Sequence, residues 1–216
     1  MNRAKNKYYQ TLQDIVSKGS MQTNKKGGIK YLINQTLSME PEDLDKIFED
    51  HPIAKKKLAA ELDLYCRGVE DVAEYNANGI MWWDYCAPRL INSYPTYFKK
   101  LPKLIEKINK EKRPSKNYML FIGETGVETN QLPCLSLMQF QLCDGKLHIT
   151  VFQRSADSSL GLPSDIYQTY LISKMIDIPL GSITFFIGNA HIYENNILPT
   201  EQLLAGHEKI KFNLNV

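Results

Sequence analysis

The sequence predicts a single α+β domain, because strand-forming and helix-forming segments both occur in a chain of 216 residues, enough for one sizeable core. Two runs of strand formers, residues 135–142 and 147–152, flank Asp144-Gly145, a pair that supplies the positive φ values of a tight hairpin turn. Segments before and after this hairpin carry apolar residues at helical spacing. The hydrophobic share of 43% agrees with one compact domain over residues 1–216.

The helical segments are predicted from apolar spacing together with start and stop signals. Gly19 and Gly68 follow two of them and predict their ends, and Pro41 favours the first turn of another. Residues 161–163, Gly-Leu-Pro, are expected to break the chain before the last helix. The expected helices are residues 7–18, 41–48, 52–66, 97–110 and 166–175, the expected further strand is 118–122, and the expected flexible, basic loop is 23–28.

The hairpin is the part of the chain where chemically capable side chains are expected to meet. Cys134 stands at the head of its first strand. Gln153, Arg154, Ser155 and Asp157 stand at the end of the second. Antiparallel pairing across the turn would bring these two ends together, so the sequence predicts a thiol, a guanidinium and several polar groups at one edge of the sheet.

Charge and cysteine usage narrow the class of protein. A net charge of +2 without a basic stripe gives no reason to expect a nucleic-acid polymer as partner, and Lys55-Lys56-Lys57 fits a solvated helix face. The four cysteines lack metal-ligand spacing, so reduced thiols in a cytoplasm and no metal are expected. No run reaches about 18 apolar residues and no signal peptide opens the chain, so no membrane role is expected.

Two longer stretches resemble the thymidylate synthase family. FQRSADSSLGLPSDI, residues 152–166, is similar to the family's YQRS-x-D-x-x-LGLP-x-N signature, which follows a Pro-Cys nucleophile motif across a DGKL hairpin. GNAHIYENN, residues 188–196, is similar to its G-D-x-H-x-Y-x-N-H segment. The resemblance covers nearly the whole chain. It implies a mixed, twisted β-sheet flanked by helices and a homodimer that pairs through this sheet.

The resemblance also implies the reacting groups. Cys134 would add to C6 of a pyrimidine and make C5 able to take up a one-carbon unit. Arg154 would lower the pKa of this thiol and bind the nucleotide phosphate, to which Ser155 would add a hydrogen bond, and Gln153 would lie beside the nucleotide. Glu61, in AAELDLYCRG, is similar to the family's HELLWFLQG glutamate, which organises water and proton transfer. A half-exposed helix residue would fit this position too.

Further substrate contacts are implied outside the hairpin. His191 and Tyr193 would bind the sugar 3′-hydroxyl, although a lone strand-end histidine also fits a structural role. Lys25 falls where the family has a phosphate-binding arginine, and an ordinary exposed loop would explain it equally well. Tyr94 falls near a family tyrosine whose neighbouring glycine, glutamine and arginine are missing here.

The co-substrate implied by the resemblance is 5,10-methylenetetrahydrofolate. Asp157 would contact its pterin ring, and Leu160 and Gly161 would lie on the same side of the site. Trp83, in GIMWWDY, is similar to a family tryptophan on the folate side of the cavity. Without the resemblance, this aromatic residue would fit the core.

One departure from the family pattern concerns the base. Asp165 stands where thymidylate synthases have asparagine, and with Cys134 and Glu61 it is a candidate catalytic residue. An asparagine amide suits uracil, whereas an aspartate accepts from the amino group of cytosine and, when protonated, also donates to N3. Within the family, aspartate here is a mark of cytidylate hydroxymethylases. Drift at a relaxed site is the alternative.

Other departures bear on phosphate and product. Residues 113–117, Arg-Pro-Ser-Lys-Asn, replace a double-arginine segment, so the phosphate site is weaker, rebuilt from Arg113 and Lys116, or adapted to another nucleotide. Leu135 follows the nucleophile where histidine is common. The chain ends at Val216, so most of the C-terminal extension that closes over folate is expected to be missing, which would admit water to the reactive methylene.

These features together predict a 5-hydroxymethyltransferase that acts on dCMP or CMP in phage DNA modification or a nucleoside pathway. One alternative is a C5 methyltransferase on dUMP, UMP or dCMP. The other is a family relative that binds a nucleotide or a partner protein without turnover, since the double arginine and the extension are missing from the sequence.

Overall fold

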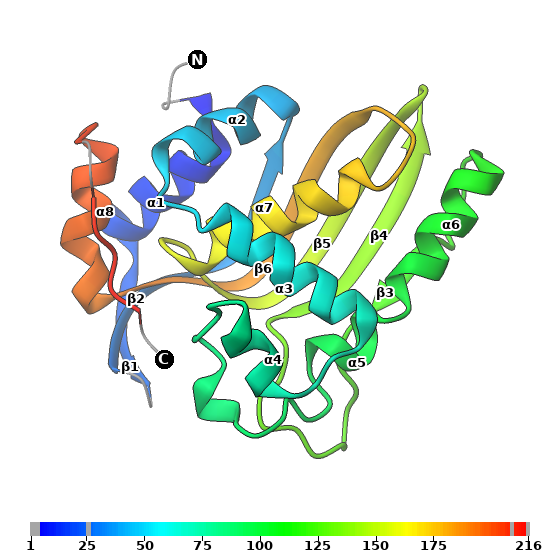
Figure 1. Cartoon of the computed structure of the whole chain (residues 1–216). Coiled ribbons are helices and arrows are strands. Elements are labelled where there is room, and N and C mark those ends of the chain that lie inside the picture. Colours follow the sequence, from blue (N-terminus) through cyan, green and yellow to red (C-terminus); the bar gives the residue numbers. More distant parts are fainter. Residues whose placement is uncertain (1–4, 25–26, 208–209, 215–216) are drawn as a thin grey trace.

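The computed structural model describes residues 5–24, 27–207 and 210–214, and within them a six-stranded sheet forms the centre of the molecule (Figure 1). The strands lie in the order β1-β2-β6-β5-β4-β3, with β5 and β6 parallel and the other neighbours antiparallel. Their bounds are β1 Ser20–Asn24, β2 Gly27–Met39, β3 Met119–Phe121, β4 Leu135–Cys143, β5 Lys146–Asp157 and β6 Leu180–Tyr193. This mixed sheet with flanking helices agrees with the predicted α+β class.

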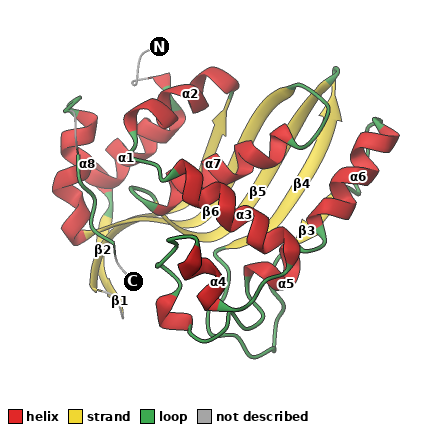
Figure 2. Cartoon of the chain, viewed as in Figure 1, coloured by secondary structure: helices red, strands yellow, loops and turns green. Residues whose placement is uncertain are grey.

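Helices cover one face of this sheet, and Figure 2 shows them in front of the strands. Helices α1, α2 and α7 contact the central strands, while α3 packs on α7 and α5. Short 3-10 turns, η2 Asp84–Cys86 and η3 Glu194–Asn196, connect other elements. The helices are α1 Lys7–Lys18, α2 Pro41–Asp50, α3 Lys55–Arg67, α4 Val72–Ala77, α5 Tyr94–Phe98, α6 Leu101–Glu111, α7 Gly161–Lys174 and α8 Ile197–Leu204.

The β4–β5 hairpin is confirmed at its turn and at its open end. Asp144 and Gly145 have φ values of 50° and 72°, the left-handed conformations that a two-residue turn requires. At the open end the backbone N–H of Arg154 donates to the carbonyl of Cys134 at 2.9 Å. The two strand ends therefore lie side by side, as the sequence predicts.

Two helix predictions are wrong in ways that proline explains. Residues 97–110 form parts of two helices, α5 and α6, because Pro102 lacks the N–H of a continuous helix and its ring would clash with the carbonyl four residues earlier. Conversely, residues 161–163 do not break the chain but form the first turn of α7. Pro163 is accepted there because N–H groups in a first turn have no partner within the helix.

The predicted basic loop at residues 23–28 is also wrong in extent. Thr23 and Asn24 belong to β1 and pair with Gly28 and Gly27 of β2, so these four residues are part of a hairpin. Lys25, which lies between them, is outside the described residues. The long strands β2 and β6 were not predicted.

Candidate active site

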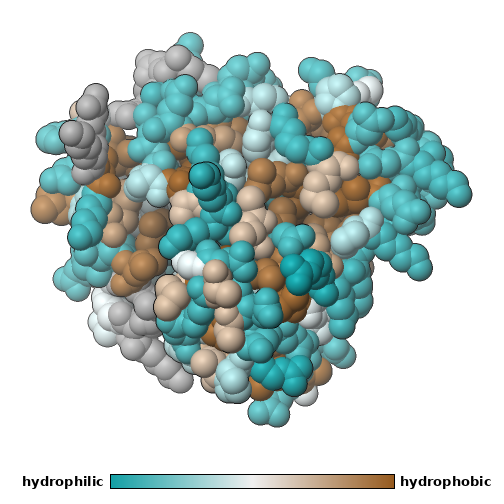
Figure 3. Space-filling view, viewed as in Figure 1, coloured by the Kyte–Doolittle hydropathy of each residue, from teal (hydrophilic) through white to brown (hydrophobic). Residues whose placement is uncertain are grey.

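A cavity of about 430 Å3 lies between helices α3, α5 and α7 and the face of the sheet that the helices cover. Figure 3 shows hydrophobic side chains gathered between hydrophilic patches where α3, α7 and β4 lie in Figure 1. The carboxyl groups of Glu61, Asp157 and Asp165 are among the polar groups of these largely apolar walls, and we call this space the carboxyl cavity. Its aromatic and aliphatic lining includes Tyr65, Trp82, Trp83, Tyr94, Leu135, Leu160, Ile172 and Leu214.

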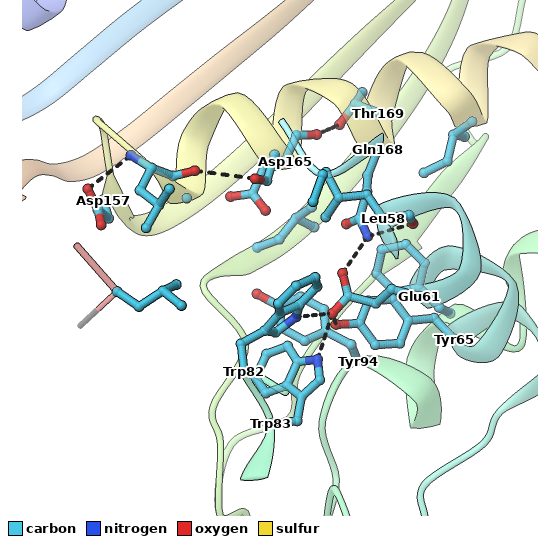
Figure 4. A pocket seen from close by; sticks show the side chains of 18 of the residues that line it. Leu58, Glu61, Tyr65, Trp82, Trp83, Tyr94, Asp157, Asp165, Gln168 and Thr169 are labelled. Carbon is cyan, nitrogen blue, oxygen red and sulfur yellow. Dashed lines mark hydrogen bonds between the residues drawn. The ribbon is translucent and has the colours of Figure 1, made fainter. Parts of the chain in front are cut away.

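Glu61 is buried, with 3% of its surface exposed, and receives four hydrogen bonds. Its Oε1 accepts from Tyr65 Oη at 2.8 Å and from the indole nitrogens of Trp82 and Trp83, each at 2.6 Å. Its Oε2 accepts from Gln168 Nε2 at 2.7 Å (Figure 4). Burial raises the pKa of Glu61, and the four hydrogen bonds oppose this rise because they favour the charged form.

Asp165 lies on the cavity side of α7 and has a simpler environment. Gln153 Nε2, from β5, donates to Asp165 Oδ2 at 2.6 Å. Burial raises the pKa of Asp165 to about 7, the bond from Gln153 opposes this, and the nearby charges of Glu61 and Asp157 add to it. Near neutral pH, Asp165 can therefore both donate and accept hydrogen bonds.

Asp157 lines the cavity at the end of β5, just before α7 begins. Its Oδ1 accepts from the backbone N–H and the hydroxyl of Ser159 at 3.1 and 2.8 Å, and from Leu160 N at 3.4 Å. Leu160, Gly161 and Trp83 also line the cavity, so the four candidates for co-substrate contact lie around one space. Burial raises the pKa of Asp157, while the Ser159 bonds and the His191 charge lower it.

Cys134, Arg154 and Ser155 form a second group, which we call the thiol edge. Cys134 Sγ lies 3.6 Å from Ser155 Oγ. Arg154 donates from Nε to the carbonyl of Pro133 at 3.1 Å and from Nη2 to the carbonyl of Leu132 at 2.9 Å. Its Nη1 donates to Ser155 Oγ at 3.3 Å. The guanidinium is thus held on the loop that leads into the thiol.

Tyr94 connects the two groups. Its ring lines the carboxyl cavity, and its hydroxyl accepts a hydrogen bond from the backbone N–H of Cys134 at 3.0 Å. Burial raises the pKa of Tyr94, and the neighbouring Cys134 and Asp165 add to that rise. Cys134 itself does not line the cavity, but it is next to two residues that do, Tyr94 through this hydrogen bond and Leu135 in sequence.

His191 and Tyr193 lie at the end of β6, next to β5. Asp157 pairs in register with His191, whose Nδ1 lies 3.1 Å from Asn189 Oδ1. The rings of His191 and Tyr193 meet edge to face at 5.2 Å. Burial lowers the pKa of His191, and the charge of Asp157 opposes this. Both residues lie outside the cavity lining, on the strand beside the thiol edge.

Several residues of the site were missed by sequence reasoning. Tyr65, Trp82 and Gln168 all donate to Glu61. Tyr65 stands four residues after Glu61 and Gln168 three after Asp165, spacings that place each pair on one helix face. Tyr85 was missed as well. Burial raises its pKa, and the neighbouring Cys86, Cys134 and Tyr193 raise it further.

Within residues 5–24, 27–207 and 210–214, no group of three or more His, Cys, Asp or Glu side chains could hold a metal ion. No helix in the same ranges has the length and apolar character needed to cross a membrane. No disulfide joins the four cysteines, all of which lie in the described chain.

Comparison with known proteins gives one family. The family model described as thymidylate synthase matches residues 6–215. The thymidylate synthase of Staphylococcus haemolyticus (strain JCSC1435) is 31% identical over 127 residues, which are 56% of this chain and 38% of that protein. The thymidylate synthase of Listeria monocytogenes serotype 4a (strain HCC23) is 39% identical over 77 residues, which are 34% of this chain and 24% of that protein. The matched segments thus span well under two thirds of either relative.

Proposed function

Because the chain belongs to the thymidylate synthase family, we propose that it transfers a one-carbon unit to C5 of a cytosine nucleoside monophosphate, dCMP or CMP, and forms the 5-hydroxymethyl product. The observation that carries this proposal is the Gln153–Asp165 pair, a neutral amide that donates to a carboxyl group at 2.6 Å inside the cavity. By the resemblance of residues 152–166 to the family signature, Asp165 corresponds to the family residue that faces the pyrimidine.

The protonation state of Asp165 favours cytosine as the base. Its pKa of about 7 means that a large fraction of the carboxyl is protonated near neutral pH. A protonated carboxyl donates to N3 of cytosine and accepts from the exocyclic amino group. A protonated carboxyl also pairs with uracil, donating to O4 and accepting from N3–H, so the preference comes from the strength of the bonds. Cytosine N3 is more basic than uracil O4 and takes the stronger hydrogen bond from the carboxyl proton.

Cys134 is proposed to start the reaction. Its thiolate adds to C6, which moves electron density to C5 and lets C5 attack the one-carbon unit. The neighbouring guanidinium of Arg154 favours the thiolate. Three N–H groups of Arg154 are engaged by Pro133, Leu132 and Ser155, so one N–H on each terminal nitrogen is left for the nucleotide phosphate.

The cavity residues fit the proposed co-substrate. Methylenetetrahydrofolate, when bound, supplies a carbon at the oxidation level of formaldehyde. The walls formed by Trp82, Trp83 and Ile172 suit a flat ring, and the carboxyl of Asp157 suits the polar edge of a pterin. Loss of the C5 proton would expel tetrahydrofolate and leave an exocyclic methylene on the base. Water would then add to this methylene, and Glu61 would accept the proton of that water. Departure of Cys134 from C6 then restores the aromatic base.

A homodimer through the sheet is the proposed assembly. On the sheet face away from α1, α2 and α7, strand register aligns Phe121, Leu137, Phe152, Phe186 and Thr36 in one row. Phe121 and Phe186 are 64% and 40% exposed, and the rings of Phe152 and Phe186 stack at 5.0 Å. Exposed apolar rows of this kind are typical of interfaces.

Light scattering after gel filtration tests the dimer. The wild type should be a dimer, and Phe186→Lys should dissociate it. Leu198→Lys, which changes an exposed leucine of α8, is the control and should leave the dimer intact.

The test of the activity uses nucleotides tritiated at C5. The protein is incubated with dCMP, CMP, dUMP or UMP, with and without methylenetetrahydrofolate. Release of tritium from a cytosine nucleotide but from neither uracil nucleotide supports the proposal. Mass spectrometry then separates a gain of CH2O, the hydroxymethyl product, from a gain of CH2, the methyl product. Release from uracil nucleotides alone would contradict the cytosine assignment, and release from none would leave nucleotide binding without turnover.

A further inference from the structure

The two oxygens of Glu61 have different environments. Oε1 accepts three hydrogen bonds, from Tyr65, Trp82 and Trp83, so its lone pairs are already engaged. Oε2 accepts from a single group in the described part of the chain, Gln168, and keeps capacity for one more donor. The oxygen that can receive a proton from a molecule in the cavity is therefore Oε2, and Gln168 is its protein partner.

The amide of Gln168 is itself fixed in place. Besides Glu61 Oε2 at 2.7 Å, its Nε2 reaches the carbonyl of Leu58 at 3.3 Å, so both of its N–H groups are directed at α3. Gln168 also follows Asp165 by three residues on the cavity side of α7 (Figure 4). One helix therefore carries the proposed base reader and the donor to the proposed general base, and any shift of α7 would move the two together.

The charge of Glu61 is balanced by neutral donors. Among the described residues, no lysine or arginine forms a salt bridge with it. Within the ranges that the structure describes, the titratable groups that interact electrostatically with it are Tyr65 on α3, Tyr75 on α4 and Asp165 on α7, and none of the three is a cation. Burial raises the pKa of Glu61, and the four donors oppose this rise because they stabilise the charged form. Loss of any one donor should therefore raise the pKa further.

We propose that Gln168 is a positioning residue that holds Oε2 of Glu61 toward the cavity as an acceptor, ready to take a proton from the water that completes hydroxymethylation. The use of Oε2 in that step rests on the proposed function. The placement of the carboxylate by Gln168 does not, and it can be tested without any substrate.

The chain offers a direct probe of Glu61. It contains two tryptophans, and both indole N–H groups donate to Oε1 of this residue. In a proton–nitrogen NMR spectrum of protein labelled at tryptophan, both indole signals should move as Glu61 titrates. In Gln168→Met, which keeps the side-chain length but has no donor, the pH of that movement should rise by about one unit.

Control variants separate positioning from general damage. Ser173→Ala removes a side-chain hydrogen bond to the Tyr170 carbonyl in the last turn of α7 and should leave the indole titration unchanged. Gln168→Ala is measured alongside Gln168→Met, so that a folding defect of one variant does not decide the outcome. An unchanged titration in a folded Gln168 variant would overturn the proposed placement.

Turnover tests the second part of the inference. In Gln168→Met we expect kcat for formation of the hydroxymethyl product to fall about tenfold, while KM for the nucleotide changes less than about twofold. The acidic limb of the pH profile of kcat should move to higher pH, as the indole titration does. Unchanged kcat with a shifted indole titration would overturn the role in catalysis. A wild-type protein without activity on any nucleotide would count against the proposed function, and the indole titration would still decide the placement.

Discussion

The thiol edge and the carboxyl cavity are neighbours, but they are held together by different kinds of contact. At the thiol edge, Arg154 bonds to the backbone carbonyls of Leu132 and Pro133, and Cys134 is fixed by strand pairing. In the cavity, Glu61 and Asp165 are held by side chains from other elements. The difference indicates that Cys134, the proposed nucleophile, is positioned mainly by the sheet, whereas Glu61 and Asp165, the proposed proton-handling groups, depend on how the helices pack.

The largest effect is expected at the thiol edge. Cys134→Ser should reduce tritium release from a cytosine nucleotide by at least about 1,000-fold, because a serine hydroxyl is a far weaker nucleophile than a thiolate near neutral pH. Nucleotide binding, measured by calorimetry, should remain detectable because Arg154 and Ser155 are unchanged. Cys143→Ser, at the exposed end of the hairpin, is the matched control and should keep full activity. Substantial turnover by Cys134→Ser would refute the nucleophile assignment.

A smaller effect is expected from the carboxyl cavity. Asp165→Asn should change the ratio of kcat/KM for cytosine over uracil nucleotides by about tenfold or more toward uracil, since it replaces a group that can donate to N3 of cytosine with one that suits uracil. Competition between the paired nucleotides in one reaction measures this ratio. If Asp165→Asn keeps the wild-type preference, the base is read by other residues.

The smallest effect concerns stability. The pKa of Asp165 is about 7 in the folded chain against an ordinary value of 3.8, so between these pH values the folded chain holds a proton that the unfolded chain has lost. The free energy of unfolding should therefore fall as pH rises through this window, and Asp165→Asn should remove about 1–2 kcal/mol of that fall between pH 5 and 8.

Urea unfolding at the two pH values measures this fall. The exposed carboxyl of Asp63 on α3, changed in Asp63→Asn, is the matched control and should leave the pH dependence as it is in the wild type. Equal pH dependence in Asp165→Asn and the wild type would show that Asp165 is ionised in the folded chain at pH 5.

The same contrast explains what could be predicted from the sequence. The hairpin turn at Asp144-Gly145 is a local sequence signal, and two strands that pair from this turn onward also lie side by side at their open ends. The approach of Cys134 to Ser155 therefore followed from sequence alone. The role of Tyr94 followed only weakly, because its contact with Cys134 joins residues 40 positions apart.

The environment of Glu61 could not be predicted, because its donors come from three separate segments. Trp82 and Trp83 lie 21 and 22 residues after Glu61, and Gln168 lies 107 residues after it. No local pattern specifies that these groups converge on one carboxylate. The helix boundaries that were wrong, at Pro102 and Pro163, show a related limit, since a proline can end a helix or begin one according to its neighbours.

Covalent trapping tests the central claim most directly. Fluorine at C5 cannot leave as a cation, so a 5-fluorinated cytosine nucleotide, incubated with methylenetetrahydrofolate, should accumulate as an adduct. Intact-protein mass spectrometry should show the chain gaining the mass of the nucleotide and co-substrate, and peptide mapping should place the adduct on Cys134. An adduct on another residue, or one formed only with the 5-fluorinated uracil nucleotide, would contradict the account.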